Sequence, residues 1–404
     1  MWSVLFVDHD VSRSGSTVSM EYLLRAFSRQ GWEVHVLTPK RGSEAESLRA
    51  TGVRILSSRG WGMNSLALDL HFSNTAPVFS PRGIKTLAKN TAKFILGLCV
   101  VCRAITRAKA SLVYVNEHVM PQASLAARIC GVPAVVHVRS RMLAGTWGFR
   151  RQIASWMTVR FNRLVFAISE EESRQLACRG VVPAHVVVVG EFVSVRDAED
   201  ARVSAALELA KIPRDCHVIS MLGGILSLKG TLTFLSAAEE IAARREDVYF
   251  VLAGPHYGDG DKREHEHYRL CMEGLARLTR KGRATYLGNI TNAPDLIAAS
   301  EIIVSPSIET HFSRPIIEAW AAGKPVVAAR TPHTEALIRD TIDGLLVPPG
   351  NGEALASSLL MLLDSPHLRR QLAEAGREKV RKRFDAATNT SWIVNRCEGL
   401  LRLP

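Results

Sequence analysis

The chain of 404 residues has little that would place it across a membrane or cross-link it. Its longest apolar run, residues 94–102, is far shorter than the roughly 20 residues that cross a bilayer as a helix. Its seven cysteines are odd in number and scattered, which argues against a disulfide framework and favours a reducing compartment. No secretory signal is recognisable, because the short apolar start runs directly into Asp8 and Asp10. The composition therefore predicts a cytoplasmic protein that does not span a membrane.

Several motifs of nucleotide, nucleophile and metal chemistry are also missing. No GxSxG segment marks a nucleophilic serine. The glycine turn GGILSLKG at 223–230 has neither the spacing nor the Lys-Ser/Thr of a Walker A loop. The segment 255–267, PHYGDGDKREHEH, predicts a polar loop leading into a helix more readily than a metal site, because His265 and His267 would not share a helix face. We therefore expect no metal and no other cofactor.

Acidic residues are almost missing from one segment. Residues 51–165 contain 16 Lys and Arg but only Asp69 and Glu117, so this segment carries the whole positive imbalance of the chain. A basic surface attracts nucleic acid, anionic lipid or an anionic substrate, although a solvated basic face needs no partner. No nucleic-acid recognition motif is present, and we expect no nucleic-acid partner. An anionic acceptor and contact of basic, apolar-faced helices with an anionic membrane surface remain as expectations.

Short, continuously apolar runs alternate with helical segments along the chain, which predicts parallel α/β sheets. The polar, alanine-rich stretch 193–212 separates two series of such units and predicts an interdomain region. We expect a Rossmann-like domain over 1–195, a second one over 196–385, and a helix over 386–404 that packs back on the N-terminal domain. Residues 58–90 are rich in polar and aromatic residues and predict irregular structure.

The individual elements follow from the same patterns. Strands are predicted at 4–7, 33–37, 53–56, 112–116, 134–138, 164–168 and 185–189, and then at 217–222, 248–253, 284–287, 302–304, 326–329 and 345–347. The main helices are predicted at 18–30, 91–108, 124–130, 150–163, 231–244, 368–383 and 389–401.

Residues 305–328, SPSIETHFSRPIIEAWAAGKPVVA, carry the strongest functional signal. Pro315 favours the first turn of a helix, and Gly323 its end. Glu318 falls in the first turns of this helix, whose unpaired N–H groups can bind phosphate. A solvent-exposed helix start with an ordinary stabilising glutamate explains the same pattern. The N–H groups of the helix start that can bind phosphate belong to Ile316 and Ile317.

Lys229 and Glu318 follow two different strands of the second predicted domain. Because parallel strands end at one edge of their sheet, a single pocket could hold a nucleotide diphosphate, with Lys229 on phosphate and Glu318 on ribose. In the first domain, His137 and Arg139 close a predicted strand, and the loop at Gly15 can bring backbone close to a ligand.

These segments resemble the retaining glycosyltransferases of the GT-B fold, glycosyltransferase family 4, in which two Rossmann-like domains face each other across a cleft. The resemblance is strong over about 215–385. It is carried there by the glycine turn with Lys229-Gly230, VLAG at 251–254, YLGNI at 286–290, VSPSIE…RPIIEAWAAGKPVV at 304–327 and DGLLVPPGN at 343–351. In the N-terminal half, the turn at Gly15 and the segments RQGWEVHVLT, GVPAVVHVR and AISE are similar to segments of the family.

The resemblance implies metal-independent transfer of a sugar from a nucleotide-diphosphate sugar, with retained anomeric configuration. The donor would lie on the C-terminal domain and the acceptor largely on the N-terminal one. The acceptor would be a glycan or lipid-linked glycan of polysaccharide or lipopolysaccharide-type synthesis, at the inner face of the cell membrane. The catalytic residues that it implies are His137, Glu309 and Lys229. The donor-binding residues are Gly15, Ser16, Gly223, Gly224, Lys229, Arg314, Ile316, Ile317 and Glu318.

The chain departs from the family pattern at two places. The family has two acids separated by seven residues, whereas here Thr310 holds the first position and Glu309 lies one residue earlier. Gly224 stands where the family usually has a phosphate-binding arginine, a role that Arg314 could take. Two alternatives therefore remain: a nucleotide-sugar epimerase or phosphorylase on the same fold, and a degenerate transferase that acts as a binding subunit.

Overall fold

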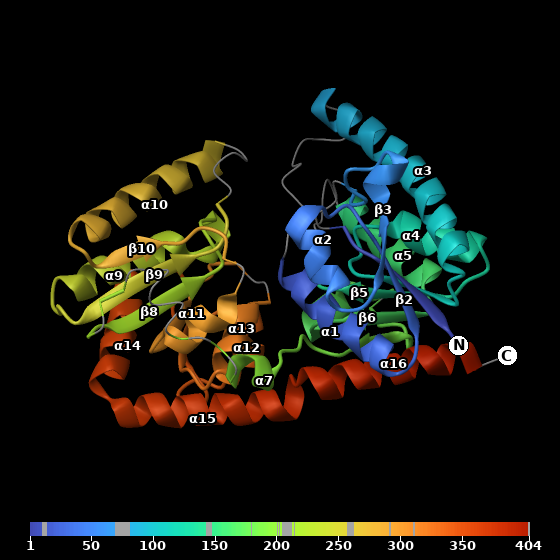
Figure 1. Cartoon of the computed structure of the whole chain (residues 1–404). Helices are drawn as coiled ribbons and strands as arrows, with labels where there is room; N and C mark the ends of the chain where they lie inside the picture. Colours follow the sequence, from blue (N-terminus) through green and yellow to red (C-terminus); the bar gives the residue numbers. More distant parts are fainter. Residues whose placement is uncertain are drawn as a thin grey trace. The chain divides into compact units, whose positions relative to one another are not determined.

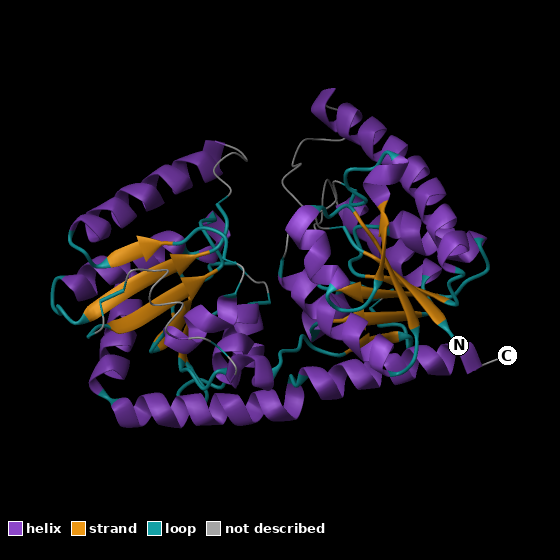
Figure 2. Cartoon of the chain, in the orientation of Figure 1, coloured by secondary structure: helices purple, strands orange, loops and turns teal. Residues whose placement is uncertain are grey.

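Two parallel sheets organise the chain, and each lies between layers of helices (Figures 1 and 2). The first unit combines Met1–Glu191 with Ala386–Pro404, and the second is Phe192–Asp385. The prediction of two parallel α/β sheets is confirmed. The computed structural model describes residues 1–9, 14–68, 81–142, 148–178, 180–199, 201, 203, 212–213, 215–256, 262–290, 292–309 and 312–402.

The first sheet has the order β3-β2-β1-β4-β5-β6-β7, and all neighbouring strands are parallel. These strands are nearly continuous apolar runs because helices cover both faces of the sheet. The strands are β1 (Ser3–Val7), β2 (Glu33–Thr38), β3 (Arg54–Ser57), β4 (Leu112–Val115), β5 (Ala134–Val138), β6 (Leu164–Ala167) and β7 (Val186–Val188). The helical elements are α1 (Gly15–Arg29), α2 (Gly42–Arg49), η1 (Ser58–Trp61), α3 (Pro81–Ala108), α4 (Pro121–Ile129), α5 (Phe149–Phe161), α6 (Glu170–Arg174) and α16 (Ala386–Arg402).

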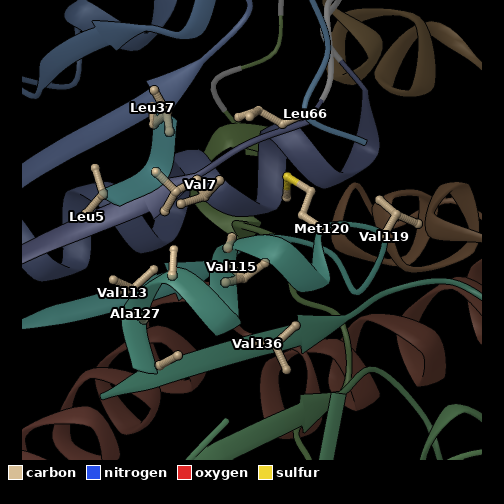
Figure 3. Close-up of a cluster of buried hydrophobic side chains, with 14 of the residues drawn as sticks. Leu5, Val7, Leu37, Leu66, Val113, Val115, Val119, Met120, Ala127 and Val136 are labelled. Carbon is tan, nitrogen blue, oxygen red and sulfur yellow. The ribbon is translucent and has the colours of Figure 1, made fainter. Parts of the chain in front are cut away.

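The two faces of this sheet have different cores. On one face, alternate residues of the strands such as Val7, Val115 and Val136 pack with buried residues of α3, α4 and α5 (Figure 3). The opposite face is aromatic, where Phe6 stacks on Tyr114 with ring centroids 4.7 Å apart. Helices α1 and α16 pack on each other on that side.

The prediction of irregular structure over 58–90 is wrong in its last part. Helix α3 begins at Pro81, ten residues before the predicted start, and η1 occupies Ser58–Trp61. The early turns of α3 leave Ile84 and Leu87 exposed, so they lack the buried stripe by which an amphipathic helix is recognised in a sequence. Residues 69–80 lie outside the described residues.

The boundary between the units falls slightly earlier than the predicted interdomain stretch 193–212. Val193 already belongs to the second unit, where its N–H donates to the Phe384 carbonyl at 2.9 Å. Helix α7 (Val195–Glu199) follows. Most of 200–211 lies outside the described residues.

The second sheet has the order β10-β9-β8-β11-β12-β13 and is also parallel throughout. Strands β8 and β11 are therefore neighbours, although two strands separate them in sequence. The strands are β8 (His217–Leu222), β9 (Val248–Ala253), β10 (Ala284–Tyr286), β11 (Ile302–Ser305), β12 (Val326–Ala329) and β13 (Leu345–Val347). Besides α7, the helical elements are η3 (Ser227–Lys229), α9 (Thr231–Ala242), α10 (Lys262–Arg280), α11 (Ala293–Ala299), α12 (Arg314–Ala321), α13 (Pro332–Leu337), α14 (Gly352–Asp364) and α15 (Pro366–Arg383).

Candidate functional site

The glycine turn after β8 is held against the turn after β9. The N–H groups of Gly223 and Gly224 both donate to the Ala253 carbonyl, at 3.0 and 2.9 Å. Gly224 has φ +77°, and a Cβ there would lie 1.9 Å from the Pro255 carbonyl oxygen. A side chain at 224 is therefore incompatible with this backbone. The arginine that the family usually has at this position cannot be accommodated in this turn.

Lys229 ends the short helix η3, directly before Gly230. Its aliphatic stem lies near Gly223, with Cδ 3.6 Å from the position of a Cβ on that glycine. The surrounding protein removes hydration from the ammonium group and lowers the pKa of Lys229 to about 8. At neutral pH the side chain is still mainly charged, and an anion beside it would be favoured.

The loop after β11 packs directly on this lysine turn. A Cβ on Gly230, which has φ +72°, would lie 1.9 Å from the Pro306 carbonyl oxygen. The Ile308 N–H donates to the Leu228 carbonyl at 3.0 Å. Glu309 follows and is exposed. The first acid of the predicted pair thus lies in a loop that is hydrogen-bonded to the lysine turn, whereas Thr310 and His311 lie outside the described residues.

Helix α12 carries the two remaining charged candidates on one face. Arg314 Nε donates to Glu318 Oε1 at 2.6 Å, and both side chains are mostly buried. The helix begins at Arg314, one residue before Pro315. The Ile316 N–H donates to the Ser313 carbonyl at 3.1 Å, so it is already engaged within the first turn. Ile316 and its neighbour Ile317 are fully buried.

Trp320 packs helix α12 against neighbouring parts of the second unit. This side chain is fully buried, and its Nε1 donates to the Asp343 carbonyl at 2.7 Å. Lys379 of α15 lies over the ring, 4.9 Å from its centroid. Gly376 of α15 touches the ring so closely that a Cβ would lie 2.1 Å from Trp320 Cδ1. Tight packing around Trp320 therefore holds in place the helix that carries Arg314 and Glu318.

In the first unit, a buried ion pair stands at the carboxyl edge of the sheet, where the parallel strands end. Lys40 Nζ lies 2.6 Å from Asp8 Oδ2, and neither side chain is exposed. Thr38 Oγ1 donates to the same oxygen at 3.3 Å. Asn116 Nδ2 lies 3.5 Å from Asp8 Oδ1 and from the Ser16 carbonyl. This network ties the start of α1 to the ends of β1, β2 and β4.

Gly15 and Ser16 open α1 at this same edge. Gly15 is the first residue of the helix, and the capping Ser14 accepts from the Thr17 N–H at 3.4 Å. Ser16 Oγ lies 2.9 Å from Ser14 Oγ. The predicted glycine turn is thus a helix N-terminus, although residues 10–13 lie outside the described residues.

His137 lies in the interior, on the aromatic face of the sheet. Its side chain is fully buried, and its Nδ1 accepts from Arg139 Nη2 at 3.1 Å and lies 3.0 Å from Tyr114 Oη. Burial and the Arg139 charge hold the pKa of His137 well below its usual value, so the imidazole is neutral. Arg139 lies beyond the end of β5 and pairs with Glu191 at 2.7 Å. Arg139 is itself buried at 8% exposure, so both groups at this strand end lie inside the protein.

Sequence reasoning missed Asp8, Lys40 and Asn116. Asp8 and Asn116 directly follow buried strands, and Lys40 stands two residues beyond one. Polar side chains at that place in parallel sheets are a usual mark of a functional edge. That signal was present in the sequence.

Two further features of the described chain bear on the predictions. Within these residues, no helix combines the length and the apolar character needed to cross a bilayer. No set of three His, Cys, Asp or Glu side chains among them is placed to hold a metal ion. Of the three histidines of 255–267, His265 and His267 lie in α10 and His256 stacks on Tyr268 of that helix, with ring centroids 4.8 Å apart.

Two family profiles match consecutive parts of the chain. The profile described as "Glycosyl transferase 4-like domain" matches residues 14–190, and "Glycosyl transferases group 1" matches residues 216–365. The chain belongs to the group 1 glycosyltransferases of family 4. The resemblance inferred from the sequence is thereby confirmed, including the GT-B fold.

Similar proteins carry several different names. The alignment with the alpha-D-kanosaminyltransferase of Streptomyces kanamyceticus is 29% identical and covers 62% of this glycosyltransferase and 66% of the relative. With the lipopolysaccharide core biosynthesis glycosyltransferase LpsE of Rhizobium meliloti it is 30% identical and covers 44% and 49%. The chain thus spans about half to two thirds of the length of these relatives. The crystal structure of Anabaena Alr3699/HepE in complex with UDP-glucose superposes with a TM-score of 0.74, at 18% identity, over 99% of this glycosyltransferase and 100% of that chain.

Proposed function

We propose that this glycosyltransferase moves a hexose from a nucleotide-diphosphate sugar to a glycan or lipid-linked glycan, with retained anomeric configuration and without a metal ion. The proposal rests on one observation: two loops contact each other at the carboxyl edge of β8 and β11. The Leu228–Ile308 hydrogen bond joins the lysine turn to the loop that leads into α12. A phosphate-binding group and a ribose-binding group then belong to one rigid frame. The UDP-glucose bound by the Anabaena neighbour supports a nucleotide-sugar donor.

In this proposal the second unit binds the donor. The Lys229 ammonium neutralises charge on the diphosphate as it leaves the sugar. Positioned donors of this kind are worth several kcal/mol in a transition state, because they need no reorganisation. Glu318 accepts from the ribose hydroxyls, and its partner Arg314 turns toward the phosphates. Exposed Glu309 contacts the donor sugar.

The first unit supplies the edge on which the acceptor hydroxyl is held. In this proposal the N-terminal turn of α1, at Gly15 and Ser16, binds phosphate through its N–H groups. His137 acts through Arg139, because the imidazole is buried and in contact with the guanidinium. A His137→Phe variant with unchanged turnover would remove His137 from this assignment.

The acceptor is proposed to be anionic and to lie at the cytoplasmic face of a membrane, in polysaccharide or lipopolysaccharide-type synthesis. The basic segment 51–165 supports this, as does the name of the Rhizobium relative. Helix α3 adds exposed apolar residues, Ile84 and Leu87, beside Lys85 and Lys89. Such a surface favours an anionic bilayer.

The test is to measure transfer with Lys229→Ala and Glu318→Ala. Lys229→Ala should lower turnover by about a hundredfold or more, as loss of one transition-state donor does. Glu318→Ala should mainly raise KM for the donor, because ribose contacts are equal in the ground and transition states. A Lys262→Ala variant, which removes a charge from the exposed start of α10, is the control. Full activity in both site variants would refute the proposed donor site.

The two alternatives give different outcomes with the same protein. Incubation with nucleotide-sugar alone converts the sugar if the chain is an epimerase, whereas a transferase at most hydrolyses it slowly. A phosphorylase would need inorganic phosphate for cleavage. A degenerate binding subunit would gain thermal stability from a nucleotide-sugar without turning it over.

A further inference from the structure

The first unit contains a large groove beside α5, with a volume of about 2000 Å³. Its walls come from the residues that lead into β5, from α5, from α6 and the residues after it, and from the last turn of α16. The volume exceeds the roughly 300–1,000 Å³ of an ordinary small-molecule pocket, so an extended ligand can be accommodated. We name it the arginine groove after the six arginines that line it. These are Arg128, Arg141, Arg151, Arg160, Arg163 and Arg174.

The charge of the arginine groove is not balanced by the protein. Glu171 is the one acidic residue among those that line it. Within the described residues, none of the six guanidinium groups takes part in an ion pair, and acids are missing from the whole segment 118–168. Like charges gathered around one concave surface repel each other and raise the local concentration of anions. Charge complementarity therefore favours an anionic occupant.

Two buried amide groups of the groove also have unused hydrogen-bonding capacity. Asn162 is only 7% exposed, and its Oδ1 has no hydrogen-bond partner among the described residues. The same holds for Gln175 Nε2, whose Oε1 accepts from the Met142 N–H at 2.7 Å. Buried polar atoms are normally paired, so these two are exceptions among the side chains that line the groove.

Part of the lining is apolar and open to solvent. Trp156 is 60% exposed and packs edge-to-face on Phe161, with ring centroids 5.6 Å apart. Leu400 and Leu401 of α16 also line the groove, and Ile153, on the same helix as Trp156 but outside the lining, is 56% exposed. Tryptophan beside arginine is typical of a surface at the boundary between lipid and water. A fully water-soluble anion would leave this apolar wall uncovered.

The groove reaches the amino ends of two strands, away from the carboxyl edge assigned to transfer, although Arg141 follows β5 and Glu171 follows β6. It includes Ala134, where β5 begins, and Asn162 and Arg163, which directly precede β6. These residues stand at the amino ends of strands whose carboxyl ends lead to Arg139 and Ser169. Occupation of the groove is therefore a second binding event.

We propose that the arginine groove binds the phosphate headgroup of an anionic lipid in a membrane, with α5 lying at the bilayer surface. The arginines bind the phosphate, Asn162 and Gln175 hydrogen-bond polar atoms of the headgroup, and Trp156 with Ile153 enters the interface. The proposal extends the membrane association proposed above. It does not depend on the donor site, because lipid binding is measured without nucleotide-sugar.

The experiment compares the full chain with Arg151→Ala/Arg160→Ala on vesicles of phosphatidylcholine, with and without phosphatidylglycerol. The wild-type protein should float with the anionic vesicles only. The variant should bind them about thirtyfold more weakly, at roughly fivefold for each arginine near the surface. The matched control is Arg25→Ala/Arg29→Ala, which removes the same charge from exposed positions of α1. Equal losses in both variants would show that net charge alone matters and would overturn the proposal.

Two competitors test the identity of the occupant. Inorganic phosphate at the lipid phosphate concentration should leave vesicle binding unchanged, and complete displacement would make the groove a soluble-phosphate site. A labelled single-stranded RNA should bind more weakly than the vesicles. Tighter RNA binding that is lost in Arg151→Ala/Arg160→Ala would assign the groove to nucleic acid and contradict the proposal.

A fluorescence measurement covers the case in which the double variant folds poorly. Spin-labelled phosphatidylcholine in the anionic vesicles should quench part of the tryptophan emission of the wild-type protein. That part should be lost in Trp156→Phe, which changes no charge. Identical quenching in both proteins would place Trp156 away from the bilayer and refute the proposed orientation.

Discussion

The carboxyl edges of the two sheets of this glycosyltransferase differ in how their charged side chains are buried and paired. In the first unit the charges are inside, where Asp8 and Lys40 form a pair with no exposed surface. In the second unit the edge consists largely of glycine backbone, with Lys229 as its partly buried charge, and the mostly buried Arg314–Glu318 pair lies on helix α12. A buried pair fixes geometry but offers little charge to a ligand. The second edge therefore offers more charge to an anionic ligand than the Asp8–Lys40 pair of the first edge does.

The largest difference between the edges should appear when one partner of each ion pair is removed. Lys40→Met leaves the Asp8 carboxylate buried without its cation and should cost about 3–5 kcal/mol of unfolding free energy. Arg314→Met should cost less, about 1–2 kcal/mol, because the Arg314 and Glu318 side chains keep 11% and 18% of their exposure and Glu318 can regain contact with water. Urea denaturation of both variants measures the comparison.

The control is the double variant Asp8→Leu/Lys40→Met, which removes both charges. It should recover much of the loss, since no unpaired charge then remains in the core. Equal costs for Lys40→Met and Arg314→Met would contradict the contrast between the edges.

Lys229 should make the free protein less stable at neutral pH than a neutral residue would. Its pKa is about 8 in the folded chain against 10.5 for the unperturbed group, so the unfolded chain binds the proton more tightly. Stability should therefore rise between about pH 8 and pH 10.5, by at most about 3 kcal/mol, and the penalty is complete below pH 8. Melting temperatures of wild type and Lys229→Met across this range measure the effect.

Lys229→Met should melt higher than wild type at pH 7 and show a smaller rise above pH 8. A saturating nucleoside diphosphate should reduce the difference, since its negative charge favours the protonated ammonium in the folded chain. A lower melting temperature for Lys229→Met at pH 7 would mean that Lys229 supports the fold instead of serving a ligand.

A smaller effect on stability should distinguish Gly223 from Gly224, the two glycines of the turn after β8. Gly224→Ala forces a Cβ into the Pro255 carbonyl, which belongs to the backbone and cannot rotate away. The cost should be about 2 kcal/mol or more, with loss of donor binding. Gly223 has φ +142°, which strains any L residue, but its Cβ would meet only the flexible stem of Lys229, so Gly223→Ala should cost less than Gly224→Ala. Thermal unfolding ranks the two variants, and the reverse order would refute this account of the turn.

Local patterns in the sequence were sufficient to predict most of the two sheets. Strands such as Val4–Val7 and Val326–Ala329 are apolar throughout because both faces are covered, and this can be read without knowing the partners. The helix predicted from Pro315 left Arg314 in the polar segment before it, whereas α12 begins at Arg314 and places it on one face with Glu318. The strand ends thus follow from short-range information, and the side-chain pair does not.

The burial of His137 could not be predicted from such short-range information. Its position at the end of a strand suggested access to a ligand, whereas the alternation of β5 turns it toward the aromatic face. On that face Phe166 packs on Trp392 of α16, more than two hundred residues later in the chain. The early part of α3 was missed for a related reason, because its apolar residues are exposed and give no core-facing stripe.

Helix α16 makes the first unit discontinuous in sequence, and this has a consequence for how the protein is made. Residues 1–191 are synthesised first, but Trp392, Ile393 and Cys397 fill the aromatic face only after residue 385 has left the ribosome. The second unit, by contrast, is complete in one continuous segment. We expect the nascent chain to carry an uncovered apolar face throughout synthesis of the second unit, so the unit that begins first is the one that finishes last.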